Sequence, residues 1–285
     1  MKPLILSTIA LELARLYAGQ AAGGVEPLRH SAEAVTASIK TAVGRMAVKQ
    51  QPFENVVPEF IIGGEWTTTL KLTNRGTASI PQGQGRAIFV DSDGRSMTAT
   101  FQITGGSVIT DSGFTFFLEP GAIVETTFFG TSQTQFGHIL IDPSTCPATA
   151  ACGLYGEAVL RNRNATRPDF ESVFPLEQPA DVQHMLFDHR SGNSTILYLV
   201  GLSSGAETVA LEFRNASNQL VRTVSVTLPS AGSQIIPLTT AAPETIGLMG
   251  TLTIRVLTAN AYVTATALKI NPSNSFTPVR AFVPK

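Results

Sequence analysis

An internal repeat of short alternating segments constrains this chain more than any other feature of its sequence. From about residue 57, segments of alternating apolar and polar residues are separated by turns rich in Gly, Asn, Asp and Pro, and after residue 183 a second series begins. The first series reads TTTLKLTN, GRAIFVD, MTATFQI, AIVETTFF, HILID and GEAVLRN, and the second reads STILYLVG, TVALEFRN, RTVSVTL, SQIIPL, GTLTIRVL and YVTATALKI. Regular short strands between such turns are typical of antiparallel sandwiches and barrels. The pattern therefore predicts a mainly β protein.

The two series also align with each other. The matched pairs are LKLTN (70–74) with LYLVG (197–201), IFVDSDGRSMTATF (88–101) with EFRNASNQLVRTVS (212–225), FLEPGA (117–122) with TLPSAG (227–232), GHILI (137–141) with GTLTI (250–254), and AVLRNRNATRPDFESVFP (158–175) with TALKINPSNSFTPVRA (266–281). A duplicated pattern of this kind predicts two tandem domains, and 285 residues are enough for two hydrophobic cores. We expect a first β-sandwich at 57–178 and a second at 179–285, joined in the PLEQPADV linker.

Composition supports this prediction and excludes one class of partner. Thr, Ser, Gly, Val and Phe are abundant while Lys and Glu are few, a bias that suits half-buried strands better than helices. Lys and Arg together number 20 and Asp and Glu 21, so no overall field attracts the chain to nucleic acid or to an anionic membrane. We therefore expect no nucleic-acid partner.

The N-terminal 22 residues have the outline of a signal peptide. Lys2 precedes an apolar run from Pro3 to Leu11, and small residues follow at 18, 19, 21 and 22. Glu12 and Arg15 interrupt what should be an uncharged stretch, so an amphipathic helix is the alternative. The apolar face of that helix would carry Ile5, Ile9, Leu13, Leu16 and Tyr17. The apolar run is too short to cross a bilayer, so we predict no transmembrane segment and expect export to the extracellular space or cell surface.

Residues 23–56 are predicted to form a short helical or linker segment. Apolar side chains recur at spacings of four and three at Leu28, Ala32, Val35, Ile39, Ala42 and Met46. Because two of these six are alanines, the stripe favours a helix packed on a domain, or a stalk, over a coiled coil.

The two cysteines, Cys146 and Cys152, lie in CPATAAC with no second Cys or His pair nearby to complete a tetrahedral metal site. In an exported protein they are expected to form a short-loop disulfide that contributes about 2 to 3 kcal/mol. In a reducing cytosol both would be free thiols.

Charge is concentrated at residues 161–171, RNRNATRPDFE, in a chain that is 14% charged. The charged residues of this cluster are Arg161, Arg163, Arg167, Asp169 and Glu171. In the aligned segment of the second half the phenylalanine persists, Phe170 being matched by Phe276, while the charged residues from 167 to 171 do not. We interpret the arginines as flanking the connection between the last two strands of the first domain, with the two acids pairing with them or with the neighbouring domain. A recognition surface is the alternative.

Three motifs suggest chemistry that the surrounding pattern argues against. DSDG at 91–94 resembles the start of a calcium loop, but helices and a later Glu do not flank it, and its counterpart NASN has no carboxylate, so both are predicted hairpin turns. GLSSG at 201–205 matches a nucleophile elbow around Ser203, yet strand-like segments on both sides predict a simple loop. His184 and His189 lie five apart, a spacing that places them on opposite faces of a strand. We therefore predict no metal, cofactor or catalytic residue. Sequence spacing does not test for a catalytic pair of carboxylates, because such a pair comes together only in the folded chain.

Several segments resemble a group of bacterial exported proteins with tandem immunoglobulin-like sandwiches. They are GGEWTTTLKLTNRGTA, IFVDSDG, FLEPGA, GLYGEAVLRNRNATRPDFESVFPL and ALKINPSNSFTPV, and RPDFE at 167–171 is the most specific. The resemblance covers about residues 57–285, with SNSFTPV replacing the RPDFE segment in the second half. It implies two tandem antiparallel immunoglobulin-like β-sandwiches and export. It implies no catalytic residue, because the group has no established activity.

The function predicted from these features is that of a non-enzymatic extracellular or cell-surface protein with a structural, spacer or adhesive role and an unknown surface or matrix partner. A carbohydrate-binding module is the first alternative, with Trp66, Tyr155 or Tyr198 as a stacking face for polysaccharide, although a lone Trp is more often a core anchor. The second alternative is a self-assembling surface subunit in which the N-terminal segment or an open sheet edge pairs with a neighbouring molecule. A hydrolase ranks last.

Overall fold

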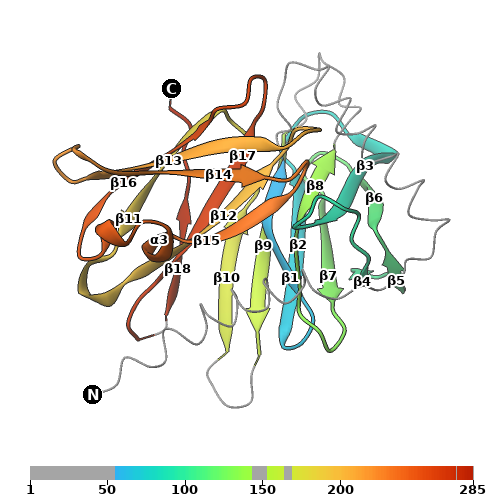
Figure 1. Cartoon of the computed structure of the whole chain (residues 1–285). Helices are drawn as coiled ribbons and strands as arrows, with labels where there is room; N and C mark the ends of the chain where they lie inside the picture. Colours follow the sequence, from blue (N-terminus) through green and yellow to red (C-terminus); the bar gives the residue numbers. More distant parts are fainter. Residues whose placement is uncertain (1–54, 143–152, 164–168, 274, 285) are drawn as a thin grey trace.

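The computed structural model describes residues 55–142, 153–163, 169–273 and 275–284. Residues 1–54, both cysteines and Arg167 lie outside the described residues, so the predicted signal peptide, helical segment and disulfide are not covered. The described part is mainly β, as the alternation predicted, and forms four antiparallel sheets (Figure 1). No helix in it has the length and apolar character needed to cross a membrane.

Two sheets from the first half of the chain pack face to face. Sheet A has the order β1-β8-β3-β6, formed by β1 (Val56–Ile62), β8 (Gln135–Asp142), β3 (Ile80–Asp91) and β6 (Gly113–Leu118). Sheet B has the order β10-β9-β2-β7-β4-β5, formed by β10 (Phe170–Pro175), β9 (Leu154–Asn162), β2 (Trp66–Asn74), β7 (Ile123–Phe129), β4 (Ala99–Ile103) and β5 (Val108–Asp111). A phenylalanine-rich core fills the space between them, with Phe89 and Phe128 edge to face at 5.2 Å. This half is sandwich-like.

The second half repeats this arrangement with its own core. Sheet D has the order β11-β16-β13-β14, formed by β11 (Val182–Asp188), β16 (Met249–Val256), β13 (Glu207–Asn215) and β14 (Leu220–Leu228). Sheet C has the order β15-β12-β17-β18, formed by β15 (Ser233–Pro237), β12 (Ser194–Gly201), β17 (Val263–Ile270) and β18 (Phe276–Arg280). Short helical pieces are η2 (Arg190–Gly192), α3 (Leu238–Ala241) and η3 (Pro243–Thr245). The apolar side chains of the two sheets meet in a second buried cluster.

Strand order shows that the sequence repeat is a structural repeat. Replacing β1, β8, β3 and β6 by β11, β16, β13 and β14 converts sheet A into sheet D, and the order β10-β9-β2-β7 becomes β18-β17-β12-β15. The hairpin β4–β5 has no equivalent in the described second half. One matched stretch was therefore wrong: residues 99–101, aligned with 223–225, lie in β4, which pairs with β7 of the opposite sheet, whereas β14 pairs with β13. The strand equivalent to β14 is β6.

The two hairpin turns that align in sequence also share their geometry. The side-chain oxygen of Asp91 accepts hydrogen bonds from the backbone N–H groups of Asp93 and Arg95, at 2.9 and 2.8 Å. Asn215 accepts the equivalent pair, from Ser217 and Gln219, both at 3.0 Å. An acid and an amide serve equally well in this role because both offer the same acceptor oxygen. The hairpin-turn interpretation of DSDG and NASN is confirmed.

The two halves lie side by side (Figure 1) and are joined by apolar packing. Along β12, Leu197 and Leu199 enter the core of the second half, while Ile196, Tyr198 and Val200 face the first half. They pack there with residues of β1, β8, β9 and β10: Val56, Ile61, Phe136, Leu140, Leu160 and Phe174. The central strands β12 and β17 of sheet C are therefore buried on both faces, and so is strand β1, whose seven residues are all buried.

Aligned positions differ in polarity according to whether they lie at this junction. Ile88 and Val90 of sheet A are covered by the second half, whereas their aligned residues in sheet D are Glu212 and Arg214. Similarly, Tyr198 of sheet C is buried at the junction, while its aligned residue in sheet B is the half-exposed Lys71. The outer faces of sheets B and D thus carry polar residues at positions where the faces of sheets A and C at the junction carry apolar ones.

Candidate functional site

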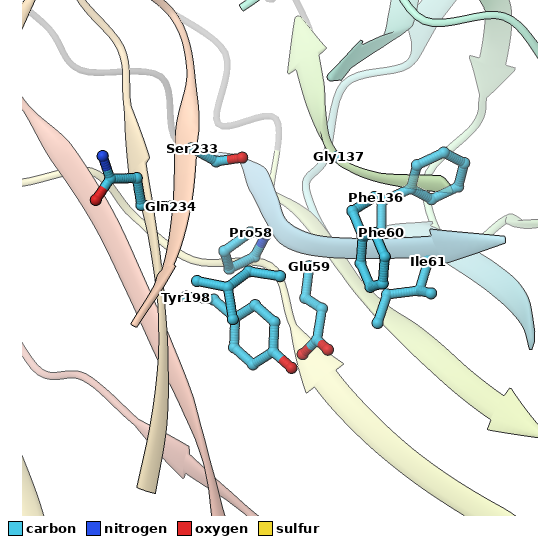
Figure 2. A pocket seen from close by; sticks show the side chains of 10 residues that line it. Pro58, Glu59, Phe60, Ile61, Phe136, Gly137, Tyr198, Ser233 and Gln234 are labelled. Carbon is cyan, nitrogen blue, oxygen red and sulfur yellow. The ribbon is translucent and has the colours of Figure 1, made fainter. Parts of the chain in front are cut away.

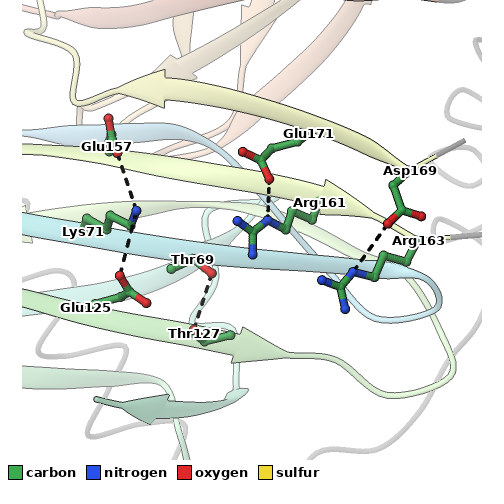
Figure 3. A network of polar contacts seen from close by, with 9 residues as sticks. All are labelled: Thr69, Lys71, Glu125, Thr127, Glu157, Arg161, Arg163, Asp169 and Glu171. Atoms are coloured by element: carbon green, nitrogen blue, oxygen red, sulfur yellow. Dashed lines mark hydrogen bonds and ion pairs between the residues drawn. The ribbon is translucent and has the colours of Figure 1, made fainter. Parts of the chain in front are cut away.

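The charged cluster at 161–171 forms ion pairs across the β9–β10 hairpin. Arg161 and Glu171 are directly opposite in the antiparallel register, and Arg161 Nε lies 2.6 Å from Glu171 Oε2. Arg163 Nε lies 3.8 Å from Asp169 Oδ2 (Figure 3). All four side chains are at least 43% exposed. The pairing of the acids with the arginines follows the sequence interpretation, but it lies at the surface, where each pair contributes less than about 1 kcal/mol.

These pairs continue into a polar network on the outer face of sheet B. Lys71 Nζ lies between Glu125 of β7 and Glu157 of β9, at 3.9 and 4.0 Å, and the hydroxyls of Thr69 and Thr127 are 3.4 Å apart (Figure 3). Each contact joins residues directly opposite on neighbouring strands. Cross-strand pairs of this kind stabilise sheet register modestly. The face contains both signs of charge.

Trp66 is part of the junction between the halves. Its ring is partly buried and meets Phe170 edge to face, with centroids 5.8 Å apart. Phe170 in turn contacts Phe276 of the second half at 4.5 Å. The two phenylalanines that align in the repeat thus touch each other, and Trp66 serves as an anchor rather than as an open stacking platform.

Tyr198 is buried, with 4% of its surface exposed, so the prediction of a stacking face at this residue was wrong. Its hydroxyl lies beside the carboxylate of Glu59 of β1 (Figure 2). The pair borders a cavity of about 10 Å³ between the halves, room for about one water molecule. Burial raises the pKa of Glu59 to about 8, and the Tyr198 hydroxyl acts in the opposite direction.

Other residues singled out in the sequence have structural roles. Ser203 lies in the loop between β12 and β13, where its backbone N–H donates to Glu207 and its hydroxyl donates to the Gly205 carbonyl at 2.8 Å. His184 faces Thr253 on sheet D, whereas His189 is buried against Thr245 at 2.8 Å. The two histidines do not converge, and no group of three metal-ligating side chains occurs within the described ranges.

A groove of about 570 Å³ runs between the halves at one end of the sheets. Its walls come from the start of β9, the linker after β10, the end of β18 and the C-terminal segment. The residues of interest among those lining it are Asn55, Tyr155, Glu177, Gln183, Arg280 and Phe282. This size lies within the range typical of small-molecule sites.

The groove combines a buried carboxylate with exposed rings. Glu177 Oε1 lies 3.2 Å from Arg280 Nε, and its side chain is 6% exposed. Burial raises the pKa of Glu177 to about 7, although Arg280 opposes this rise. Tyr155 and Phe282 are each 53% exposed. Of the three aromatic residues that the sequence offered as stacking faces, Tyr155 is the one that remains open.

Sequence reasoning missed the polar residues of both the cavity and the groove. One signal of a buried polar group was present in the sequence: Glu59 is a lone acid in the apolar run VVPEFII. Glu177 stands in a linker and Arg280 lies 103 residues away, so their pairing exists only in the folded chain. Spacing along the chain could not have joined them.

Comparisons with known proteins do not assign a family. No family model and no curated protein matches the chain. Among solved structures, the chain is similar to a lectin from Pleurotus ostreatus crystallised in complex with GalNAc, with a TM-score of 0.18 and 14% identity over 81% of this chain and 84% of that chain. At that TM-score the similarity carries no argument about fold or ligand.

Proposed function

We propose that this chain is a non-enzymatic, exported protein in which two immunoglobulin-like sandwiches form one rigid body with a structural or adhesive role at the cell surface. The observation that carries the proposal is the apolar junction. A flexible spacer would need a polar linker between independent domains, whereas here Tyr198 and Phe174 of opposite halves pack at 6.5 Å and both are buried.

Backbone contacts support the same arrangement. The N–H of Ser233 donates to the carbonyl of Ser92 at 2.9 Å, joining the β14–β15 turn to the DSDG hairpin. At Gly94 of that hairpin, a Cβ atom would lie 1.8 Å from the Ser230 carbonyl oxygen. The turns of the two halves are thus in direct contact, which fixes how their outer faces are oriented for a partner.

An adhesion assay with a junction variant tests the proposal. Beads carrying the purified chain are expected to be retained on cells and matrix material of the source organism. Tyr198→Lys places at the junction the residue found at the aligned position 71, and should separate the halves without unfolding them. We expect it to reduce retention, while Lys71→Ala on the exposed face leaves the junction intact. Equal retention of wild type and Tyr198→Lys would contradict a role for the rigid body, and no retention of the wild type would contradict adhesion.

Export is tested separately by fractionating the source cells and sequencing the N-terminus of the protein found outside. Loss of residues near 1–22 is the expected result. Full-length protein confined to the cytosol would contradict it.

A second candidate function is binding of carbohydrate. The observation that favours it is the open ring of Tyr155 at the groove between the halves. Exposed aromatic rings beside a few fixed polar groups are the usual elements of such sites.

A further inference from the structure

We propose that the groove between the two halves binds a neutral saccharide, with ring contacts from Tyr155 and Phe282 and hydrogen bonds from a buried polar floor. This inference rests on the carbohydrate-binding candidate above and names its site and ligand class. The ligand would contact both halves, because Tyr155 belongs to β9 and Phe282 follows β18.

The two rings supply the apolar contacts. Each is 53% exposed although it lines the groove. The guanidinium of Arg75 lies 4.7 Å from the centroid of the Tyr155 ring, and the ring of His184 lies 5.6 Å from that of Phe282. These neighbours limit ring movement, so both rings are held in place before a ligand arrives. Held rings lose less conformational entropy on binding than mobile ones.

The floor supplies an acceptor and donors. Glu177 is buried to 5% exposure and its carboxylate pairs with Arg280 at 3.2 Å. The Arg280 side chain is 64% exposed, so its remaining N–H groups can donate to a ligand. Asn55 is 2% exposed, and its side-chain nitrogen has no hydrogen-bond partner among the described residues. A buried donor of this kind gains free energy when a ligand oxygen satisfies it.

These groups together select a neutral polyhydroxy compound. Above pH 7, where Glu177 is ionised, its charge and that of Arg280 cancel, so an anionic ligand would meet the carboxylate and a cationic ligand would meet the guanidinium. A sugar hydroxyl both donates and accepts, which lets neighbouring hydroxyls bind the acid and the arginine at once. The C–H faces of a pyranose ring match flat aromatic rings. A saccharide therefore satisfies each feature of the groove.

Saturation-transfer NMR with a panel of neutral disaccharides tests the proposal. The probes are cellobiose, maltose, lactose and N,N′-diacetylchitobiose, each with the full chain. We expect transfer to at least one of them and a dissociation constant that rises about ten-fold or more in Tyr155→Ala and in Glu177→Gln. The matched controls are Phe117→Ala, which removes an exposed ring on β6, and Glu157→Gln, which removes an exposed acid on sheet B.

Two outcomes would overturn the proposal. The first is absence of transfer to every probe, and the second is binding that is equally strong in both groove variants and both controls. Tyr155 is exposed, so its variant should fold, and a wild-type-like amide spectrum confirms that. If Glu177→Gln fails to fold, the comparison of Tyr155→Ala with Phe117→Ala decides alone.

The bead assay separates this site from the wider function. Adhesion without disaccharide binding would leave the rigid-body proposal standing and remove the saccharide site. Disaccharide binding without adhesion would support the saccharide site and contradict the adhesive role of the rigid body.

Discussion

Replacing Glu59 by Gln should make the free energy of unfolding less dependent on pH, because this residue is buried at the junction between the halves. Glu59 is buried in β1 beside Tyr198, and burial raises its pKa from 4.5 to about 8. Between those pH values the unfolded chain has released a proton that the folded chain retains. The free energy of unfolding therefore falls as the pH rises, by about 1.4 kcal/mol per pH unit, and the contribution of the neutral acid is complete only below pH 4.5.

The window above pH 6.5 isolates this effect. Burial lowers the pKa of His138 to about 3 and that of His189 to about 4, so the stability linked to these neutral histidines is lost below pH 6.5 and is constant above it. The pKa of Glu177 is raised to about 7, and this contribution is the same in the wild type and the variant. From pH 6.5 to 8 the wild type should lose about 2 kcal/mol more than Glu59→Gln.

Urea unfolding at pH 6.5 and pH 8 measures this difference. Glu157→Gln, which removes an exposed acid on sheet B, should keep the wild-type dependence on pH. The reasoning is refuted if Glu59→Gln loses as much stability over this window as the wild type does.

Three further predictions concern packing, surface charge and backbone. Phe174→Ala should lower the free energy of unfolding by about 3 to 5 kcal/mol because the ring is fully buried at the junction, and a loss below about 1 kcal/mol in chemical denaturation would show that the site is not packed as described. A double-mutant cycle on Arg161 and Glu171 should give a coupling of less than about 1 kcal/mol, since both side chains are more than 40% exposed, and a larger value would mean that the pair is shielded from water. Gly94→Ala should lower the melting temperature more than Gly105→Ala does: both glycines have φ near +80°, but a Cβ atom at 94 would lie 1.8 Å from a carbonyl oxygen while none lies within 4 Å at 105. Equal effects would show that the turns of the two halves do not touch.

Alternation predicted many of the strands, such as β2, which contains TTTLKLTN, and β9, which contains GEAVLRN. The segment STILYLVG was also predicted and coincides with β12, although that strand is buried on both faces. Strands β6 and β11 alternate in burial but were not among the predicted segments. Strand β1, which was not predicted, reads VVPEFII with every residue buried, so period two is absent. A strand between two cores loses alternation because both of its faces need apolar residues. The junction that buries β1 is a tertiary feature and leaves no local signal of its own.

The candidate site was harder to predict than the fold for a related reason. The charge cluster at 161–171 was visible because its members are close in sequence, and it proved to be an exposed ladder of paired charges. The groove draws on residues as far apart as Asn55 and Phe282. Its polar groups are few and ordinary in their local context. Their burial and proximity, which would let them bind a ligand together, arise only when the two halves dock.

The contrast between aligned faces limits how many copies of this unit can stack. Docking by the same geometry would require a third unit to place an apolar face against sheet D, where Glu212 and Arg255 form an ion pair at 3.8 Å. Desolvating that pair without apolar contacts in return is unfavourable. Sheets B and D therefore act as end caps, and the pairing of units terminates at two. A chain designed with Ile and Val at positions 212 and 214, as at 88 and 90, would lose the cap on sheet D and would be expected to self-associate through that face, while Lys71 keeps the cap on sheet B.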